Sequence, residues 1–138
     1  LFPYTTLFRS GVDVTPEYDP FEAGLGFAVD MDTAFVGREA LQAVADQGPD
    51  RTRTAVTLDD PDAVVFNGAP VLVDDETVGY AASADYGYSV GRGIVTSYLP
   101  VEHADPGTSV AVQYENERYP ATVREEPLFD PGRDRLLR

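Results

Sequence analysis

The feature that most constrains the fold is a run of short apolar segments between residues 51 and 124, separated by compact polar turns. Apolar and polar residues alternate along these segments, a period typical of strands that bury one face. The connections at 74–76 and 115–117 are short and polar, which predicts two β-hairpins. Strands at this spacing predict a compact antiparallel barrel or sandwich. The predicted strands are 53–58, 70–73, 77–81, 93–99, 109–114 and 118–124.

Residues 11–50 follow a different pattern. The first ten, 11–20, contain two prolines and three acids and are predicted to form a loop. Residues 25–31 alternate between apolar and small or acidic side chains, which predicts a half-buried strand. Residues 38–47 carry an apolar stripe at helical spacing, and Gly48-Pro49 ends the predicted helix. We therefore expect the end of an α+β domain, followed by an all-β unit that forms a small antiparallel β-barrel.

The amino-terminal string LFPYTTLFRS, residues 1–10, differs from everything that follows it. It resembles the translation of a short-read sequencing adapter, although its alternation is also compatible with an edge strand. We expect residues 1–10 to be such a scar and the coding sequence to begin inside a longer gene. The expected divisions are then 11–50, a barrel at 51–127 and a tail at 128–138.

Charge and composition exclude several classes of function. The chain carries 24 acids and ten basic residues, all of them arginine, for a net charge of −14. Nucleic acids and anionic membranes are polyanions, so we expect neither as a partner. The dispersed acids favour adaptation to molar salt over a surface made for a basic partner. Cysteine is absent, which excludes disulfides, thiolate zinc sites and cysteine nucleophiles.

The sequence offers few sets of residues that could form a catalytic or metal site. His103 is the single histidine and lies in a turn-like stretch, so neither a catalytic triad nor a histidine-rich metal site is possible. The acids at 59–62 begin like a calcium loop, but the glycine and distal glutamate of an EF-hand are missing. We therefore predict no catalytic residue and no metal ligand in this chain, and interpret 59–62 as a turn.

Glu22 is the one side chain whose environment demands an explanation. It is the only acid in the stretch Phe21–Phe27, and a carboxylate among apolar residues needs a partner to offset its desolvation. Either nearby backbone N–H groups satisfy it, or it is kept for a ligand that offers paired donors. The residues alone leave both interpretations open.

Three segments together resemble a known family. TPEYDPFEAGLGFAVDMDTAFVGREAL (15–41) resembles the end of the folate-binding domain of the glycine-cleavage aminomethyltransferase family, which includes the folate domains of dimethylglycine and sarcosine dehydrogenases. GAPVLVDDETVGYAASADYGYSVGRGIVTSYLP (68–100) is similar to its carboxy-terminal barrel signature. GTSVAVQYENERYPATVREEPLFDP (107–131) is similar to its closing hairpin and tail. The resemblance covers nearly all of residues 11–138, and several linked motifs make it specific.

The resemblance implies tetrahydrofolate as the ligand, held by Glu22 and Arg53. A pterin presents an amino group and a ring N–H side by side, a donor pair that suits a bidentate carboxylate at Glu22. The family also has an arginine near the start of the first barrel strand, matched here by Arg53 or, two positions away, by Arg51. A guanidinium there would orient the ligand or pair with its carboxylates, although a surface salt bridge is equally compatible with Arg53.

The resemblance also implies what the chain lacks. The family's essential aspartate lies in its amino-terminal half, so we expect this fragment to be inactive by itself. The expected reaction passes an amine-derived one-carbon unit to tetrahydrofolate in a cytoplasmic enzyme. PLFDP with Arg133 and Arg135, and the stretch 86–89, resemble the dehydrogenase-fused branch, which would add FAD in an upstream domain. The alternatives are a free-standing aminomethyltransferase working with a lipoyl carrier protein, or a non-catalytic folate-binding factor of the same fold.

Overall fold

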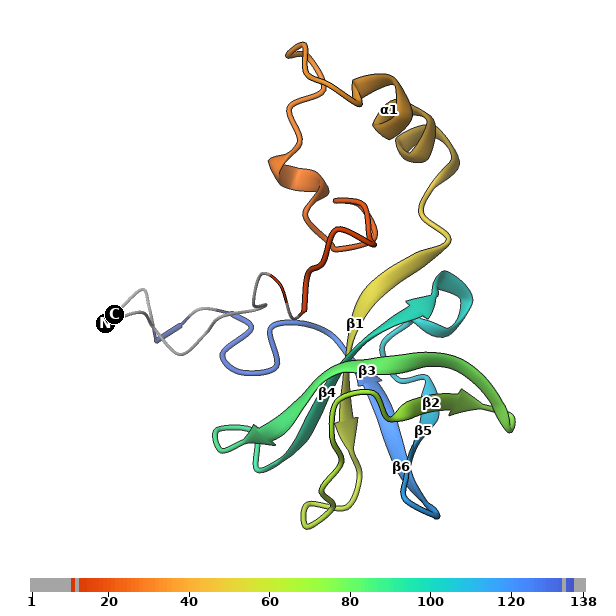
Figure 1. The fold of residues 1–138 in the computed structure, drawn as a ribbon. Helices are drawn as coiled ribbons and strands as arrows, with labels where there is room; N and C mark the ends of the chain where they lie inside the picture. The colour runs from red at the N-terminus through yellow and green to blue at the C-terminus, as the bar shows by residue number, and fades with distance from the viewer. Residues whose placement is uncertain (1–10, 12, 133, 136–138) are drawn as a thin grey trace.

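The computed structural model describes residue 11, residues 13–132 and residues 134–135 (Figure 1). The string LFPYTTLFRS lies outside the described residues, as does Arg133. In these described residues, a short 3-10 turn, η1, and one α-helix precede six strands, with a second 3-10 turn, η2, between the fourth and the fifth strand. The elements are η1 (Gly26–Ala28), α1 (Arg38–Gln47), β1 (Arg51–Leu58), β2 (Pro70–Val73), β3 (Glu76–Gly87), β4 (Arg92–Pro100), η2 (Val101–His103), β5 (Ser109–Tyr114) and β6 (Glu117–Arg124).

The six strands form a closed antiparallel barrel in the order β1-β4-β3-β2-β5-β6. β1 closes it by pairing with both β4 and β6, with Ala55 opposite Thr96 on one side and opposite Arg124 on the other. The predicted fold class, an α+β fragment followed by a small antiparallel β-barrel, is confirmed. Each predicted strand of 51–124 is present, and β3 is longer than expected because it spans both β2 and β4.

Both predicted hairpins are present, and their turns explain the residue types found there. Val73 pairs with Glu76, which leaves Asp74 and Asp75 as a two-residue turn with φ of 47° and 70°. Positive φ at both central residues is the geometry that matches the twist of paired strands, and aspartate tolerates it better than most residues. The residue types of the turn itself, two aspartates that tolerate positive φ, therefore account for this hairpin.

Apolar side chains from all six strands fill the barrel, among them Val56, Leu58, Val71, Val95 and Leu99 at 0% exposure. Gly79 marks a close approach of β3 to β4. A Cβ built there would lie 2.8 Å from both the hydroxyl oxygen of Ser97 and the carbonyl oxygen of Tyr98. Only glycine lets the two strands come this near without a shift of the backbone.

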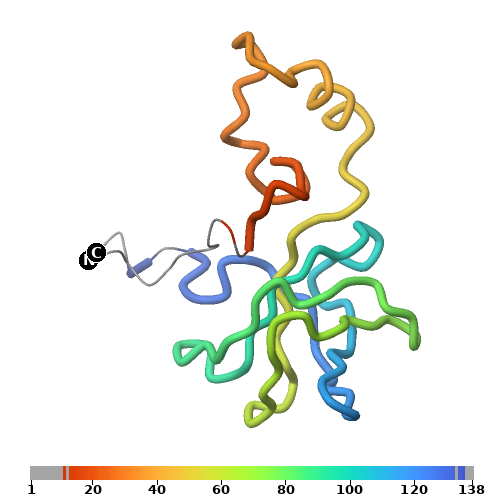
Figure 2. The backbone as a smooth tube through the Cα atoms, in the orientation of Figure 1, coloured from red at the N-terminus to blue at the C-terminus, as the bar shows by residue number. Residues whose placement is uncertain are grey.

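The segment before the barrel corrects one prediction and confirms another. Residues 25–31 do not form a strand: they contain the turn η1, and Phe27 is 87% exposed. The alternation was misleading because the side chains it pairs do not share a buried face. The helix is confirmed with its predicted bounds, and it ends at Gly48 with φ of 81°. No residue of α1 is buried, and the helix stands away from the barrel in Figures 1 and 2. Among the described residues, no helix is long and apolar enough to span a membrane.

Candidate functional site

Two residues opposite each other in the barrel wall hold the preceding segment in place. Arg53 on β1 pairs in register with Tyr98 on β4. The ring of Tyr98 stacks on that of Tyr18 with centroids 3.5 Å apart, and its hydroxyl donates to the carbonyl oxygen of Asp13 at 2.8 Å. Tyr98 is only 3% exposed. Residues 13–18 therefore rest on the barrel through an aromatic contact with one buried hydrogen bond.

Burial changes the acidity of Tyr98. The phenolate would lose its hydration inside this contact, and this desolvation raises the pKa of Tyr98 to about 12 from an ordinary value of 10.0. The nearby Arg53 guanidinium lowers the same pKa, whereas the negative charges of Asp13 and Glu22 raise it. Tyr98 is thus held neutral as a hydrogen-bond donor.

Arg53 ties three parts of the chain together. Its backbone N–H donates to the carbonyl oxygen of Glu22 at 2.7 Å, and its Nε donates to that of Ala23 at 3.3 Å. Its two terminal nitrogens donate to both carboxylate oxygens of Glu126, at 3.1 and 2.6 Å. The arginine side chain is 8% exposed and that of Glu126 is 25% exposed. Such a bidentate, mostly buried pair fixes the guanidinium plane.

The carboxylate of Glu22 belongs to a reciprocal cap. Its Oε2 accepts the backbone N–H of Asp19 at 3.0 Å, while Oδ1 of Asp19 accepts the N–H groups of Phe21 and Glu22 at 2.7 and 2.9 Å. This is a capping box around a single turn, with Pro20 at its favoured first position. Gly24, with φ of 72°, closes the turn as a C-terminal glycine does.

This geometry matches the first of the two interpretations that the sequence left open, in which backbone amides satisfy Glu22. The pattern Asp-Pro-x-Glu followed by glycine could have predicted the cap, because each position is a known capping preference. The cap occupies Oε2; within the described residues Oε1 accepts no hydrogen bond. Whether Glu22 also meets a ligand stays a prediction.

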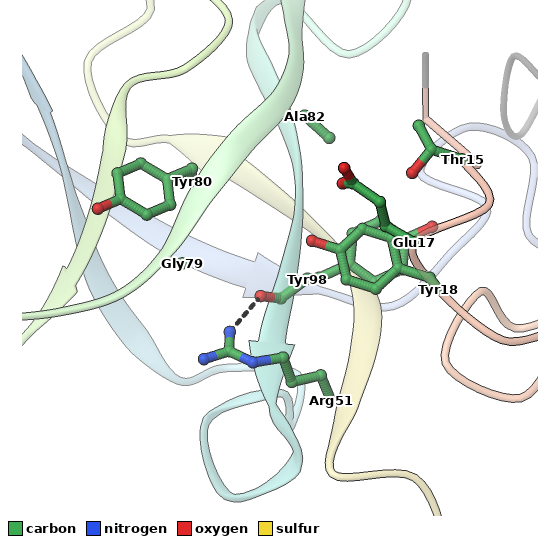
Figure 3. A pocket seen from close by; sticks show the side chains of 8 residues that line it. All are labelled: Thr15, Glu17, Tyr18, Arg51, Gly79, Tyr80, Ala82 and Tyr98. Atoms are coloured by element: carbon green, nitrogen blue, oxygen red, sulfur yellow. Dashed lines mark hydrogen bonds between the residues drawn. The ribbon is translucent and has the colours of Figure 1, made fainter. Parts of the chain in front are cut away.

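A cleft of about 220 Å³ opens beside the stacked tyrosines (Figure 3). Thr15, Glu17 and Tyr18 form one wall, and Arg51, Gly79, Tyr80, Ala82 and Tyr98 form the other. Glu22 and Arg53 are not among these lining residues, whereas Arg51, the alternative to Arg53, is. Arg51 donates to the carbonyl oxygens of Val78 at 2.7 Å and Tyr98 at 3.1 Å. The hydroxyl oxygen of Thr15 is buried with no partner in the described part of the chain.

The remaining sequence candidates take no part in this junction. His103 ends the turn η2, and its Nε2 lies 3.9 Å from the carboxylate of Glu102. Asp60 accepts the backbone N–H of Asp62 at 2.9 Å, which makes 59–62 a turn as predicted. Over residues 11, 13–132 and 134–135, no three acidic or histidine side chains are grouped so as to hold a metal ion.

Comparison with known proteins gives a consistent result. Residues 51–130 match the glycine cleavage T-protein C-terminal barrel domain. The chain is 35% identical over 128 residues to 4-methylaminobutanoate oxidase (formaldehyde-forming) of Paenarthrobacter nicotinovorans, and 33% identical over 123 residues to a probable aminomethyltransferase of Natronomonas pharaonis. It is 30% identical over 134 residues to human mitochondrial dimethylglycine dehydrogenase.

The fold has a solved counterpart in the glycine cleavage system aminomethyltransferase T from Bartonella henselae, with a TM-score of 0.83 and 24% identity. The likeness covers 91% of this chain and 36% of that one. The matched region amounts to 15%, 34% and 16% of the oxidase, the Natronomonas protein and the human dehydrogenase. The chain therefore spans a minor part of each relative.

Proposed function

The chain belongs to the glycine cleavage T-protein family through its C-terminal barrel domain, and from this premise we propose that it is the C-terminal part of a protein that transfers one-carbon units to tetrahydrofolate. The observation that carries the proposal is the family match over 51–130, joined to the residues 13–24 that the barrel holds through Arg53 and Tyr98. We assign the domains as 11–50, the end of the folate-binding domain, and 51–127, the barrel, with a tail at 128–138.

We propose that Glu22 and Arg53 border the tetrahydrofolate site. Glu22 can accept further donors, because each carboxylate oxygen offers two lone-pair directions and Oε1 has no hydrogen bond within the described residues. Arg53 acts on the same turn through its bonds to the carbonyl oxygens of Glu22 and Ala23. A paired N–H donor edge, such as that of a pterin, fits this acceptor.

In the whole protein, bound tetrahydrofolate would supply the nitrogen nucleophiles that take up an amine-derived one-carbon unit. The role of this chain is to bind and orient tetrahydrofolate, since the positioning of reactants can supply a large part of an enzyme's rate enhancement. We infer that the chain by itself has no turnover, because the family's essential aspartate, which lies near the folate nitrogens that react, belongs to the amino-terminal half of these proteins. No residue of this chain is therefore assigned a catalytic role.

We further propose a protein of the dehydrogenase-fused branch, acting on dimethylglycine or sarcosine with FAD bound in an upstream domain. The support is the resemblance of residues 86–89 and of PLFDP to that branch. Identities of 35% to an oxidase and of 33% to an aminomethyltransferase do not separate the branches. A free-standing aminomethyltransferase that works with a lipoyl carrier protein is thus the second candidate. The coding sequence upstream separates them, since only the first candidate requires an FAD-binding domain there.

The ligand role of Glu22 is tested by Glu22→Gln in the full-length protein. Glutamine serves in a capping box as glutamate does, so the turn should keep its cap while the negative charge is lost. Hydrogen bonds to charged groups contribute about 1.5–3 kcal/mol. We therefore expect the Kd of tetrahydrofolate, measured by calorimetry, to rise roughly 10- to 100-fold with little change in melting temperature.

The matched control is Glu39→Gln, which removes the same charge from an exposed position on α1 and should leave the affinity unchanged. Unaltered affinity in Glu22→Gln would leave Glu22 with its capping role alone. A large drop in melting temperature in the same variant would show that the cap needs the charge itself.

We also propose that the protein is cytoplasmic and adapted to molar salt. The support for salt adaptation is the net charge of −14 without a single lysine, together with exposed acids such as Asp59, Asp60, Asp74 and Asp75. Self-repulsion among them weakens as salt shortens the screening length.

A further inference from the structure

We propose that Glu126 is a positioning residue for the ligand site: it holds the Arg53 guanidinium against the turn that presents Glu22 to the ligand. The inference rests on the proposed function, because it concerns how the turn that carries Glu22 is presented. Glu126 lies in the segment that follows β6, 73 residues after Arg53 in the sequence. No motif marked it in advance.

The buried guanidinium needs a counter-charge. Arg53 is 8% exposed, and a cation in such a place is costly unless an acid pairs with it. Glu126 meets this need with both carboxylate oxygens, at 3.1 and 2.6 Å from the two terminal nitrogens of Arg53. The fork-to-fork geometry also fixes the plane of the guanidinium, which points its Nε at the carbonyl oxygen of Ala23.

Glu22 is carried by the turn that Arg53 contacts. Its main chain already touches Arg53, through the bond between its carbonyl oxygen and the Arg53 N–H at 2.7 Å. With Glu126 in place, Oε2 of Glu22 stays on the Asp19 N–H. Without Glu126 the plane of the guanidinium is no longer fixed, so the bond of its Nε to the Ala23 carbonyl oxygen loosens and the turn that carries Glu22 shifts.

The test is a double-mutant cycle in the full-length protein, with the Kd of tetrahydrofolate as the readout. We expect Glu126→Gln to raise Kd about 10-fold, and Glu126→Asp, which restores the charge on a shorter side chain, to recover part of that loss. In a Glu22→Gln background, Glu126→Gln should have no further effect on Kd, because the group that it positions is already gone. A purely structural role for Glu126 would instead give additive losses.

The control is Glu125→Gln, the same change at the adjacent exposed position, which should leave Kd at the wild-type value. Wild-type affinity in Glu126→Gln, tighter binding in that variant, or additivity in the cycle would each overturn the inference. If Glu126→Gln does not fold, the same cycle is run with Glu126→Asp, and additivity there overturns the inference equally. A wild-type protein that fails to bind tetrahydrofolate refutes the proposed function instead, so the two failures are distinguishable.

Discussion

Alkaline unfolding of this chain should be governed by Tyr98. The chain has no lysine and no cysteine, so tyrosines are the only side chains with ordinary pKa values between about 8 and 12. The folded-state pKa of Tyr98 is raised to about 12 from 10.0. Between these values the folded state keeps a proton that the unfolded state has lost. Stability is then fully present below pH 10 and declines as the pH rises toward 12.

The size of the effect follows from the shift. One bound proton corresponds to a fall of about 1.4 kcal/mol in unfolding free energy per pH unit, or roughly 2–3 kcal/mol over the whole window. Tyr98→Phe keeps the ring on Tyr18 but removes the hydroxyl that donates to Asp13. At pH 8 that loss should cost about 1–3 kcal/mol, because it removes one partner of a buried hydrogen bond.

The assay is urea unfolding of the wild type and of Tyr98→Phe at intervals from pH 8 to 12, followed by circular dichroism. The two stability curves should converge as the pH rises, since the variant lacks the group whose ionisation destabilises the wild type. Tyr88→Phe is the control for a hydroxyl at the surface, since Tyr88 is 91% exposed, and its curve should run close to that of the wild type. Parallel curves for the wild type and Tyr98→Phe would refute the assignment of the alkaline transition to Tyr98.

Two further predictions concern the barrel and its surface. Gly79→Ala should lower the unfolding free energy, measured by urea unfolding, by about 1–3 kcal/mol. The added Cβ would lie 2.8 Å from the Tyr98 carbonyl oxygen, which also accepts a hydrogen bond from Arg51. An unfolding free energy equal to that of the wild type would mean that β3 and β4 can move apart without loss of stability. Raising potassium chloride from about 0.1 M, where the Debye length is near 10 Å, to 1 M, where it is near 3 Å, should increase the melting temperature. A flat or falling melting temperature would count against salt adaptation.

Local chemistry made much of the fold predictable. The hairpin turn predicted at 74–76, which the structure narrows to Asp74-Asp75, and the helix end at Gly48 each follow from the conformational preference of a few neighbouring residues. The strand expected at 25–31 failed because alternation is also produced by irregular turns whose apolar side chains face solvent, as Phe27 does. Period alone does not say which face is buried.

The candidate site was less accessible to sequence reasoning. The contacts of Arg53 with Ala23 and Glu126 join positions 30 and 73 residues apart, and their pairing is decided by the order in which strands close the barrel. The stack of Tyr18 on Tyr98 is equally non-local. The cap around Glu22 was within reach, because Asp19, Pro20 and Gly24 occupy positions that such turns favour.

Closure of the barrel has a consequence for how such a unit can be inherited. With β1 bonded to both β4 and β6, each strand has a hydrogen-bonded neighbour on either side. Exposed strand edges are templates for unwanted association between chains. In a closed barrel these edges are already paired with neighbouring strands. A module of this kind can be joined to new neighbours by gene fusion with little risk of cross-pairing. The matched region makes up 15% of one relative and 34% of another. Such different shares are expected of a module that has been joined to different neighbouring domains.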